Sequence, residues 1–158
     1  MPDVRFLVTD ESARLARWIR LMGFDAGLMA AQPVSALYRR AVNEQRVVVT
    51  RNTRVKPGAL VRVVTLTSQE LKAQLGQLAR ELRLPLEEAW MFNRCDRCNS
   101  DLEPVEKAQV KDRVPPYVFR TQARFHRCPS CGRIYWAATH WQRAQRFLAQ
   151  VREEVGHA

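Results

Sequence analysis

Four cysteines carry the clearest chemistry in this chain of 158 residues. They form two Cys-x-x-Cys hooks, Cys95 with Cys98 and Cys128 with Cys131. Each hook is short enough to bring two thiolates to one ion, and two hooks complete the tetrahedron of a structural zinc site. Because all four cysteines are then ligands, no open position remains for a catalytic water. Gly132 follows the second hook and suits a turn that points backbone amides toward the sulfurs.

Three other uses of the cysteines remain open from the sequence. Two disulfides would fit an oxidising compartment. A dithiol redox pair needs one hook only and leaves the second unexplained. An iron–sulfur centre would use the same four thiolates. Structural Zn²⁺ accounts for both hooks and fits a reducing compartment, so we expect a zinc ribbon in a cytoplasmic protein.

A second feature is a basic stretch near the C-terminus that contains no acidic residue. Between residues 113 and 152 there are eight arginines and no Asp or Glu. Guanidinium groups bind phosphate bidentately, and the interleaved aromatic rings can stack on unpaired bases. The stretch predicts a site for RNA, single-stranded or structured, and its assigned residues are Arg113, Arg120, Arg124, Arg127 and Arg133. The alternative is a solvated basic face, with the aromatic side chains filling the small core of a ribbon.

Composition favours the same class of partner. Lys and Arg number 26 against 16 Asp and Glu, and the resulting net charge of +10 attracts polyanions. The chain is 46% hydrophobic and 27% charged, as in ordinary globular proteins, which argues against bulk disorder. No apolar run approaches the roughly 18 residues of a membrane span, and the first residues lack a secretory-signal pattern. We therefore expect no membrane partner.

The elements that position these groups follow from hydrophobic periodicity. Strands are predicted over 4–8, 24–29, 46–50 and 60–66, and helices over 12–22, 34–45 and 141–155, with a further helix that residues 67–70 open and that carries leucines to Leu82. Gly23 is expected to cap the first helix, and Thr67 with Glu70 to open the third as a capping box. Alternating strands and helices predict a mainly parallel α/β sheet. The character of the chain changes near residue 90, so we divide it into an α/β unit, 1–90, and a cysteine-bearing appendage with a C-terminal helix, 91–158.

Several of these stretches together resemble one known family. The chain is similar to the PIN-like ribonuclease-type domain found at the C-terminus of the mut-seven exonuclease and as stand-alone prokaryotic proteins. The similar segments, which match in order and spacing, are 6–8, 15–25, 46–51, 94–99, 113–116 and 128–136. The resemblance implies a PIN-like α/β fold of a mainly parallel sheet with flanking helices, an appended zinc ribbon and RNA as the substrate class.

The family resemblance also implies aspartates at the carboxyl ends of the strands, where they hold Mg²⁺ or Mn²⁺ in an active enzyme. In this sequence Thr9 stands at the first such place, no acidic residue lies near Val34, and Asn52 stands at the third. Asp10 is adjacent to Thr9, but one residue along an extended segment turns a side chain to the opposite side. The remaining candidates for a catalytic site are Asp10, Asp25 and Asn52.

Three functions follow from these observations. The first is an RNA-binding PIN-like protein whose nuclease site has degenerated. The second is a metal-dependent ribonuclease that uses Asp10, Asp25 and Asn52 in a relaxed site. The third is a protein-interaction module of a larger assembly, which exposed apolar patches on the ribbon would favour. The direction of the side chains at Thr9 and Asp10 distinguishes the first two.

Overall fold

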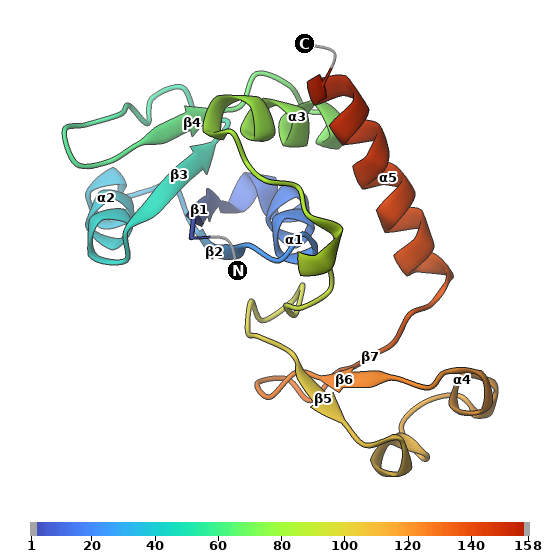
Figure 1. The fold of residues 1–158 in the computed structure, drawn as a ribbon. Coiled ribbons are helices and arrows are strands. Elements are labelled where there is room, and N and C mark those ends of the chain that lie inside the picture. Colours follow the sequence, from blue (N-terminus) through green and yellow to red (C-terminus); the bar gives the residue numbers. More distant parts are fainter. Residues whose placement is uncertain (1–2, 157–158) are drawn as a thin grey trace.

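Strands and helices alternate through the first half of the chain (Figure 1). The structure is a computed structural model that describes residues 3–156. Its first part comprises β1 (Arg5–Thr9), η1 (Asp10–Ser12), α1 (Ala13–Leu21), β2 (Asp25–Met29), α2 (Val34–Asn43), β3 (Arg46–Thr50), β4 (Val63–Thr65), α3 (Leu71–Leu82) and η2 (Glu88–Trp90). The second part comprises β5 (Glu103–Val105), η3 (Lys107–Val110), α4 (Pro116–Thr121), β6 (Phe125–Arg127), β7 (Ile134–Tyr135) and α5 (Thr139–Gly156).

The larger sheet has four parallel strands in the order β2-β1-β3-β4. The two central strands, β1 and β3, contain continuous apolar runs because both of their faces are covered. Phe6 and Val8 join the core formed with α1 and α3, whereas Leu7, one residue away, joins the core under α2. The mainly parallel α/β sheet predicted from the sequence is confirmed, and its register places Thr9 and Thr50 at the same carboxyl edge.

The first helix ends as its sequence predicts. Gly23 has φ of +94° and donates its backbone N–H to the carbonyl of Arg20 at 2.9 Å. A Cβ at this position would lie 2.4 Å from the carbonyl oxygen of Trp90, so only glycine fits. The left-handed turn at Gly23 leads the chain from α1 into β2.

The third helix begins at Leu71, and the predicted capping box at Thr67 is wrong. Gln77 is the seventh residue of the helix, and its side-chain oxygen accepts the backbone N–H of Thr67 at 3.1 Å and the hydroxyl of Thr67 at 3.3 Å. Ser68 accepts the N–H of Glu70 at 3.0 Å. These local bonds hold residues 67–70 in a turn that precedes the helix.

The second sheet is small and antiparallel, with strand order β5-β6-β7. Its core consists of Val110, Val114 and Phe125, with half-buried side chains such as Trp136 around them. A cluster of this size buries little apolar area, so the sheet needs another source of stability. The first cysteine hook precedes β5 in the chain, and the second lies between β6 and β7.

We call the part of the chain that holds the small sheet β5-β6-β7 the ribbon. Helix α5 follows the ribbon in the chain but packs on the unit that contains the four-stranded sheet (Figure 1). Ala144, Leu148 and Val151 are buried in the core that α1 and α3 share with the sheet. Lys72 of α3 pairs with Glu154 at 2.8 Å. The C-terminal helix thus joins the α/β unit in space, although the two are separated by the whole ribbon in sequence. No helix among residues 3–156 has the length and apolarity needed to cross a membrane.

Candidate functional site

The four cysteines converge on one point. Their sulfur atoms all lie within 4.8 Å of one another, and the Sγ atoms of Cys95 and Cys131 are 3.9 Å apart. A disulfide requires about 2.0 Å, whereas a tetrahedron with metal–sulfur bonds of about 2.3 Å has edges of about 3.8 Å. The predicted cluster is therefore assembled with the spacing of a metal site, and it could hold an ion such as zinc.

The two hooks are built alike. In the first, the N–H of Cys98 donates to the sulfur of Cys95 at 3.3 Å; in the second, the N–H of Cys131 donates to that of Cys128 at 3.4 Å. The residue after each hook takes positive φ, 64° at Asn99 and 74° at Gly132. Glycine and asparagine adopt this conformation most readily. Each turn thus directs an amide at a sulfur, as the glycine in the sequence predicts.

Crowding of the thiols favours a bound cation. Cys95 and Cys128 are buried, and Cys98 and Cys131 are exposed. The contact with Cys131, followed by burial and the other thiols, raises the pKa of the Cys98 thiol to about 12. A cation at the centre reverses this effect because it stabilises the thiolates.

A different set of side chains meets at the carboxyl edge of the large sheet. Oε1 of Glu11 lies 2.5 Å from the hydroxyl of Thr9 and 3.1 Å from that of Thr50. The same oxygen accepts the backbone N–H of Arg51 at 3.0 Å. Thr9 and Thr50 are fully buried, and their hydroxyls are 2.8 Å apart. We call Thr9, Glu11 and Thr50 the strand-end cluster.

The charge in this cluster belongs to Glu11. Burial raises the pKa of its carboxyl group, but the hydrogen bonds from Thr9, from the Arg51 backbone and from Thr50 outweigh that effect. The net pKa lies below the ordinary value, so the group is ionised at neutral pH. Thr9, and not Asp10, faces this edge.

The three acidic-site candidates from the sequence do not meet. Asp10 is exposed at the start of η1. Asn52 uses its side-chain oxygen to accept the N–H of Arg54 at 3.0 Å and gives its own N–H to Thr50. Asp25 opens β2, opposite Arg5 of β1, and therefore lies at the amino-terminal edge of the sheet. The sheet stands between Asp25 and the other two.

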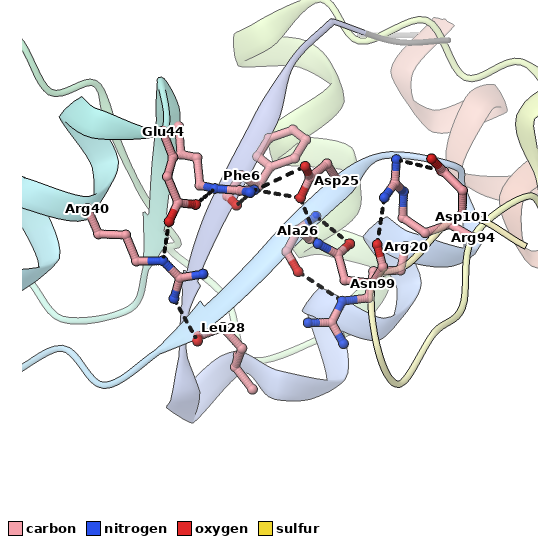
Figure 2. A network of polar contacts seen from close by, with 11 residues as sticks. Phe6, Arg20, Asp25, Ala26, Leu28, Arg40, Glu44, Arg94, Asn99 and Asp101 are labelled. Carbon is pink, nitrogen blue, oxygen red and sulfur yellow. Dashed lines mark hydrogen bonds and ion pairs between the residues drawn. The ribbon is translucent and has the colours of Figure 1, made fainter. Parts of the chain in front are cut away.

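Asp25 has structural partners at its own edge (Figure 2). Arg46 donates to its carboxylate at 2.6 Å and 3.3 Å, and the amide of Asn99 donates at 2.6 Å. Burial raises the pKa of Asp25, but the bonds from Arg46 and Asn99 leave it below its usual value. Asn99 also accepts the buried N–H of Ala26 at 2.9 Å. The first cysteine hook is therefore docked on strand β2.

A second set of bonds ties this hook to helix α1. Arg20, only 7% exposed, donates to the carbonyl oxygens of Asp96 and Arg97 at 3.0 Å each. Arg17 donates to Oδ2 of Asp96 at 2.7 Å, and the hydroxyl of Tyr135 donates to Oδ1 at 2.7 Å. Hook residues thus join both parts of the molecule.

The five arginines assigned to RNA are all exposed. Arg113 donates to the carbonyl of Gly132 at 2.6 Å, and Arg127 lies 3.9 Å from Glu103. Arg120, Arg124 and Arg133 form no ion pair within residues 3–156. The guanidinium groups of these last three arginines therefore remain available to an anion.

Most aromatic side chains of this stretch have packing partners. Phe125 is buried and contacts the ring of Trp136, and Phe119 lies beneath the ammonium of Lys107. Tyr117, with 68% of its surface exposed, is the most open of these rings. Phe125 and Trp136 therefore fill the core of the ribbon, as the alternative interpretation expects.

Comparison with known families decides what the chain is. The family model for the Mut7-C RNAse domain matches residues 4–148, nearly the whole chain. The chain belongs to the Mut7-C RNAse domain family. Neither the curated proteins nor the solved structures gave a match. Family membership confirms the resemblance inferred from the sequence and indicates a nuclease-like, RNA-related role.

In this Mut7-C domain, sequence reasoning missed Glu11. The period of two of an extended segment does not apply here, because residues 10–12 form the 3-10 helix η1, and Glu11 reaches back to Thr9 from this turn. The docking residues Arg20, Asp96 and Asn99 were missed as well. Nothing in the sequence pairs an arginine of the first helix with a hook about 75 residues later, because such contacts depend on tertiary packing.

Proposed function

We propose that this Mut7-C domain protein binds RNA, that its ribbon contains structural Zn²⁺, and that its nuclease site is degenerate. The strand-end cluster carries the proposal. At the first place where the family resemblance implies an aspartate, this chain has the buried Thr9, which lies beside the hydroxyl of Thr50 and the carboxylate of Glu11, and at the third place it has Asn52. A surface that binds RNA and lacks the metal ligands for hydrolysis would retain its substrate without cleaving it.

The residues at the carboxyl edge do not fit Mg²⁺ or Mn²⁺. Such ions are held by several carboxylate oxygens and keep waters for the reaction. Here Glu11 supplies the only carboxylate of the strand-end cluster, and three donors already occupy its Oε1. Among residues 3–156, the four cysteines are the only group of three or more His, Cys, Asp or Glu side chains close enough to hold a metal.

The two other functions receive less support. A ribonuclease using Asp10, Asp25 and Asn52 would need ligands from opposite edges of one sheet. An interaction module would be favoured by a continuous apolar patch on the ribbon. The large hydrophobic side chains most exposed among residues 3–156 are Leu28, Val42, Leu60 and Tyr117, of which only Tyr117 belongs to the ribbon.

Zinc is the ion we propose for the cysteine cluster. Four thiolates are one of the usual ligand sets of structural zinc, and two amide-to-sulfur hydrogen bonds lower the charge on the ligands. A reduced thiol site supports a cytoplasmic location. We retain 1–90 and 91–158 as the PIN-like and ribbon units of the chain, with α5 as the segment of the second unit that packs on the first.

The salt dependence of RNA affinity tests the binding half of the proposal. If all five assigned arginines neutralise one phosphate each, log affinity for single-stranded RNA should fall with log salt at a slope of about −3.5. Arg124→Gln should make that slope shallower by about 0.7. Arg39→Gln, which removes an equally exposed arginine from α2, serves as the control and should leave the slope unchanged. Equal slopes for both variants would exclude Arg124 as a contact, and an RNA affinity below detection would refute the function.

A further inference from the structure

The structure contains a cleft that neither the cysteine cluster nor the strand-end cluster explains. It has a volume of about 720 Å³ and lies where α1, α5 and the ribbon meet. Helix α1 contributes Arg14, Arg17, Trp18 and Leu21, which share one helical face because they recur at intervals of three and four residues. Its size falls within the usual range for small-molecule sites, about 300 to 1,000 Å³.

Two further walls complete the cleft. Helix α5 contributes His140, Arg143, Ala144 and Phe147, again on one face. Strand β7 and its flanks contribute Arg133, Tyr135 and Trp136. Segments from both ends of the chain therefore enclose one space, which explains why no local motif in the sequence indicated it.

The cleft is strongly positive. Arg14, Arg133 and Arg143 form no ion pair in the described part of the chain. The one acidic residue of the lining is Asp96, and its two oxygens accept bonds from Arg17 and Tyr135. An anion entering the cleft would meet Arg14 and Arg143, which form no ion pair among residues 3–156, and Arg133, whose charge also acts on Asp96, a carboxylate already bound by Arg17.

Aromatic rings line the same space. Trp18 and Trp136 are half-buried, and the ring of Trp18 packs against that of Phe147, which also lines the cleft, at a centroid distance of 4.5 Å. A ring held in place by a neighbour is a preorganised stacking platform, because little side-chain entropy is lost on binding. Arginines beside such rings suit a ligand that carries both a flat base and a phosphate.

We propose that this cleft binds one nucleotide unit of single-stranded RNA, with its base among Trp18 and Trp136 and its phosphates at Arg14, Arg133 and Arg143. The inference rests on the proposed RNA-binding function and adds a second site for RNA. Of the five ribbon arginines, only Arg133 lines this cleft. An acidic peptide would satisfy the arginines but would make no use of the aromatic walls. A duplex would keep its bases stacked internally and away from the cleft.

The test measures binding of a fluorescent oligouridylate of about ten nucleotides to the zinc-loaded protein by anisotropy, near 100 mM salt. Three competitors are a strand of equal length without bases, a duplex, and a polyglutamate peptide of equal charge. The variant Arg14→Glu with Arg143→Glu reverses the charge of two exposed side chains that form no ion pair among residues 3–156. Arg39→Glu with Arg80→Glu makes the same change in net charge on α2 and α3.

The proposal expects the cleft variant to weaken oligouridylate binding by at least about tenfold relative to the charge-matched control. It also expects the strand without bases to bind the parent protein at least about tenfold more weakly than oligouridylate. Equal affinity of the cleft variant and the control would overturn the cleft site while leaving RNA binding by the protein intact. A baseless strand or polyglutamate that competes as well as oligouridylate would overturn it too. A parent protein that binds none of the nucleic acids would refute the proposed function itself.

Discussion

At the scale of single residues, the central feature is the hydroxyl of Thr9 at a strand end where the family resemblance implies an acidic side chain. Thr9 and Thr50 are buried side by side, and each lies within hydrogen-bonding distance of Glu11. A hydroxyl pair has no charge to repel, so it packs at this edge without a cation. Glu11 then acts as an acceptor that satisfies buried donors, a structural task that an ionised carboxylate performs well.

The pH dependence of stability should reveal this task. The folded-state pKa of Glu11 lies below 4.5, its ordinary value, so its stabilising contribution is present above that value and is lost as pH falls through the folded pKa. We expect Glu11→Gln to lower the free energy of unfolding by about 1 kcal/mol at neutral pH. This figure already allows for screening by solvent, because the carboxylate is partly exposed. The difference from the parent should vanish in acid.

Denaturant unfolding of both proteins between about pH 7 and pH 3 measures this difference, and comparing two proteins cancels any shared loss of metal in acid. Glu87→Gln removes an exposed carboxylate and serves as the control. A Glu11→Gln effect that stays constant across this range would contradict the role assigned to the charge.

At the scale of elements, the two cysteine hooks have the same backbone conformation but differ in the residues around them. Asn99 of the first hook binds Ala26 and Asp25 of strand β2. Gly132 occupies the matching position of the second hook and has open space beside it, with Arg113 3.6 Å from an added Cβ. The asparagine therefore keeps the positive φ and adds a docking contact, whereas the glycine supplies the turn alone.

A pair of substitutions separates turn from docking. Asn99→Gly keeps the left-handed turn but leaves the Ala26 N–H without its acceptor, so we expect a loss of about 1 to 3 kcal/mol in stability. Gly132→Asn should cost about 0.5 kcal/mol or less, since asparagine tolerates positive φ. Denaturation midpoints with zinc content measured in parallel check both values. Equal losses for the two variants would mean that Asn99 serves only the turn.

The elements also show which parts of the fold and of the site could be predicted from the sequence. Strand β3 was predicted with its observed bounds, Arg46–Thr50, because a β-branched apolar run needs no tertiary information. The cysteine cluster was predicted from spacing for the same reason. Glu11, Asn99 and the lining of the cleft were not, because each depends on which elements lie side by side. The capping box failed where Gln77, a residue seven positions beyond Glu70, took the bond expected of a nearer one.

At the scale of the whole molecule, the two parts are joined twice. The first hook is fixed to α1 and β2 by Arg20 and Asn99, and helix α5 returns from the ribbon to the core beside α3. Between these attachments lies the ribbon, whose own core is small. A metal in the cysteine cluster would link the second hook to the first and so hold one wall of the cleft against the other.

Removal of the metal should therefore loosen the middle of the chain and spare its ends. We expect a chelator to increase amide hydrogen exchange in β5, β6 and β7, since metal binding supplies much of the folding energy of a small ribbon. Strands β1 to β4 should stay protected, and so should α5, because Leu148 and Val151 remain in the larger core. Loss of protection in α5 together with the ribbon would show that the helix depends on the metal.

The central claim is that the protein holds RNA and does not cleave it. One measurement addresses both halves: single-stranded RNA with a label at one end is incubated with excess zinc-loaded protein and Mn²⁺, and bound and cleaved fractions are read from the same sample. The account predicts that the RNA is bound and stays intact. Cleavage that disappears in Asp10→Ala or Glu11→Gln would contradict it, since loss in a variant excludes a contaminating nuclease, and RNA left both unbound and intact would contradict the binding half.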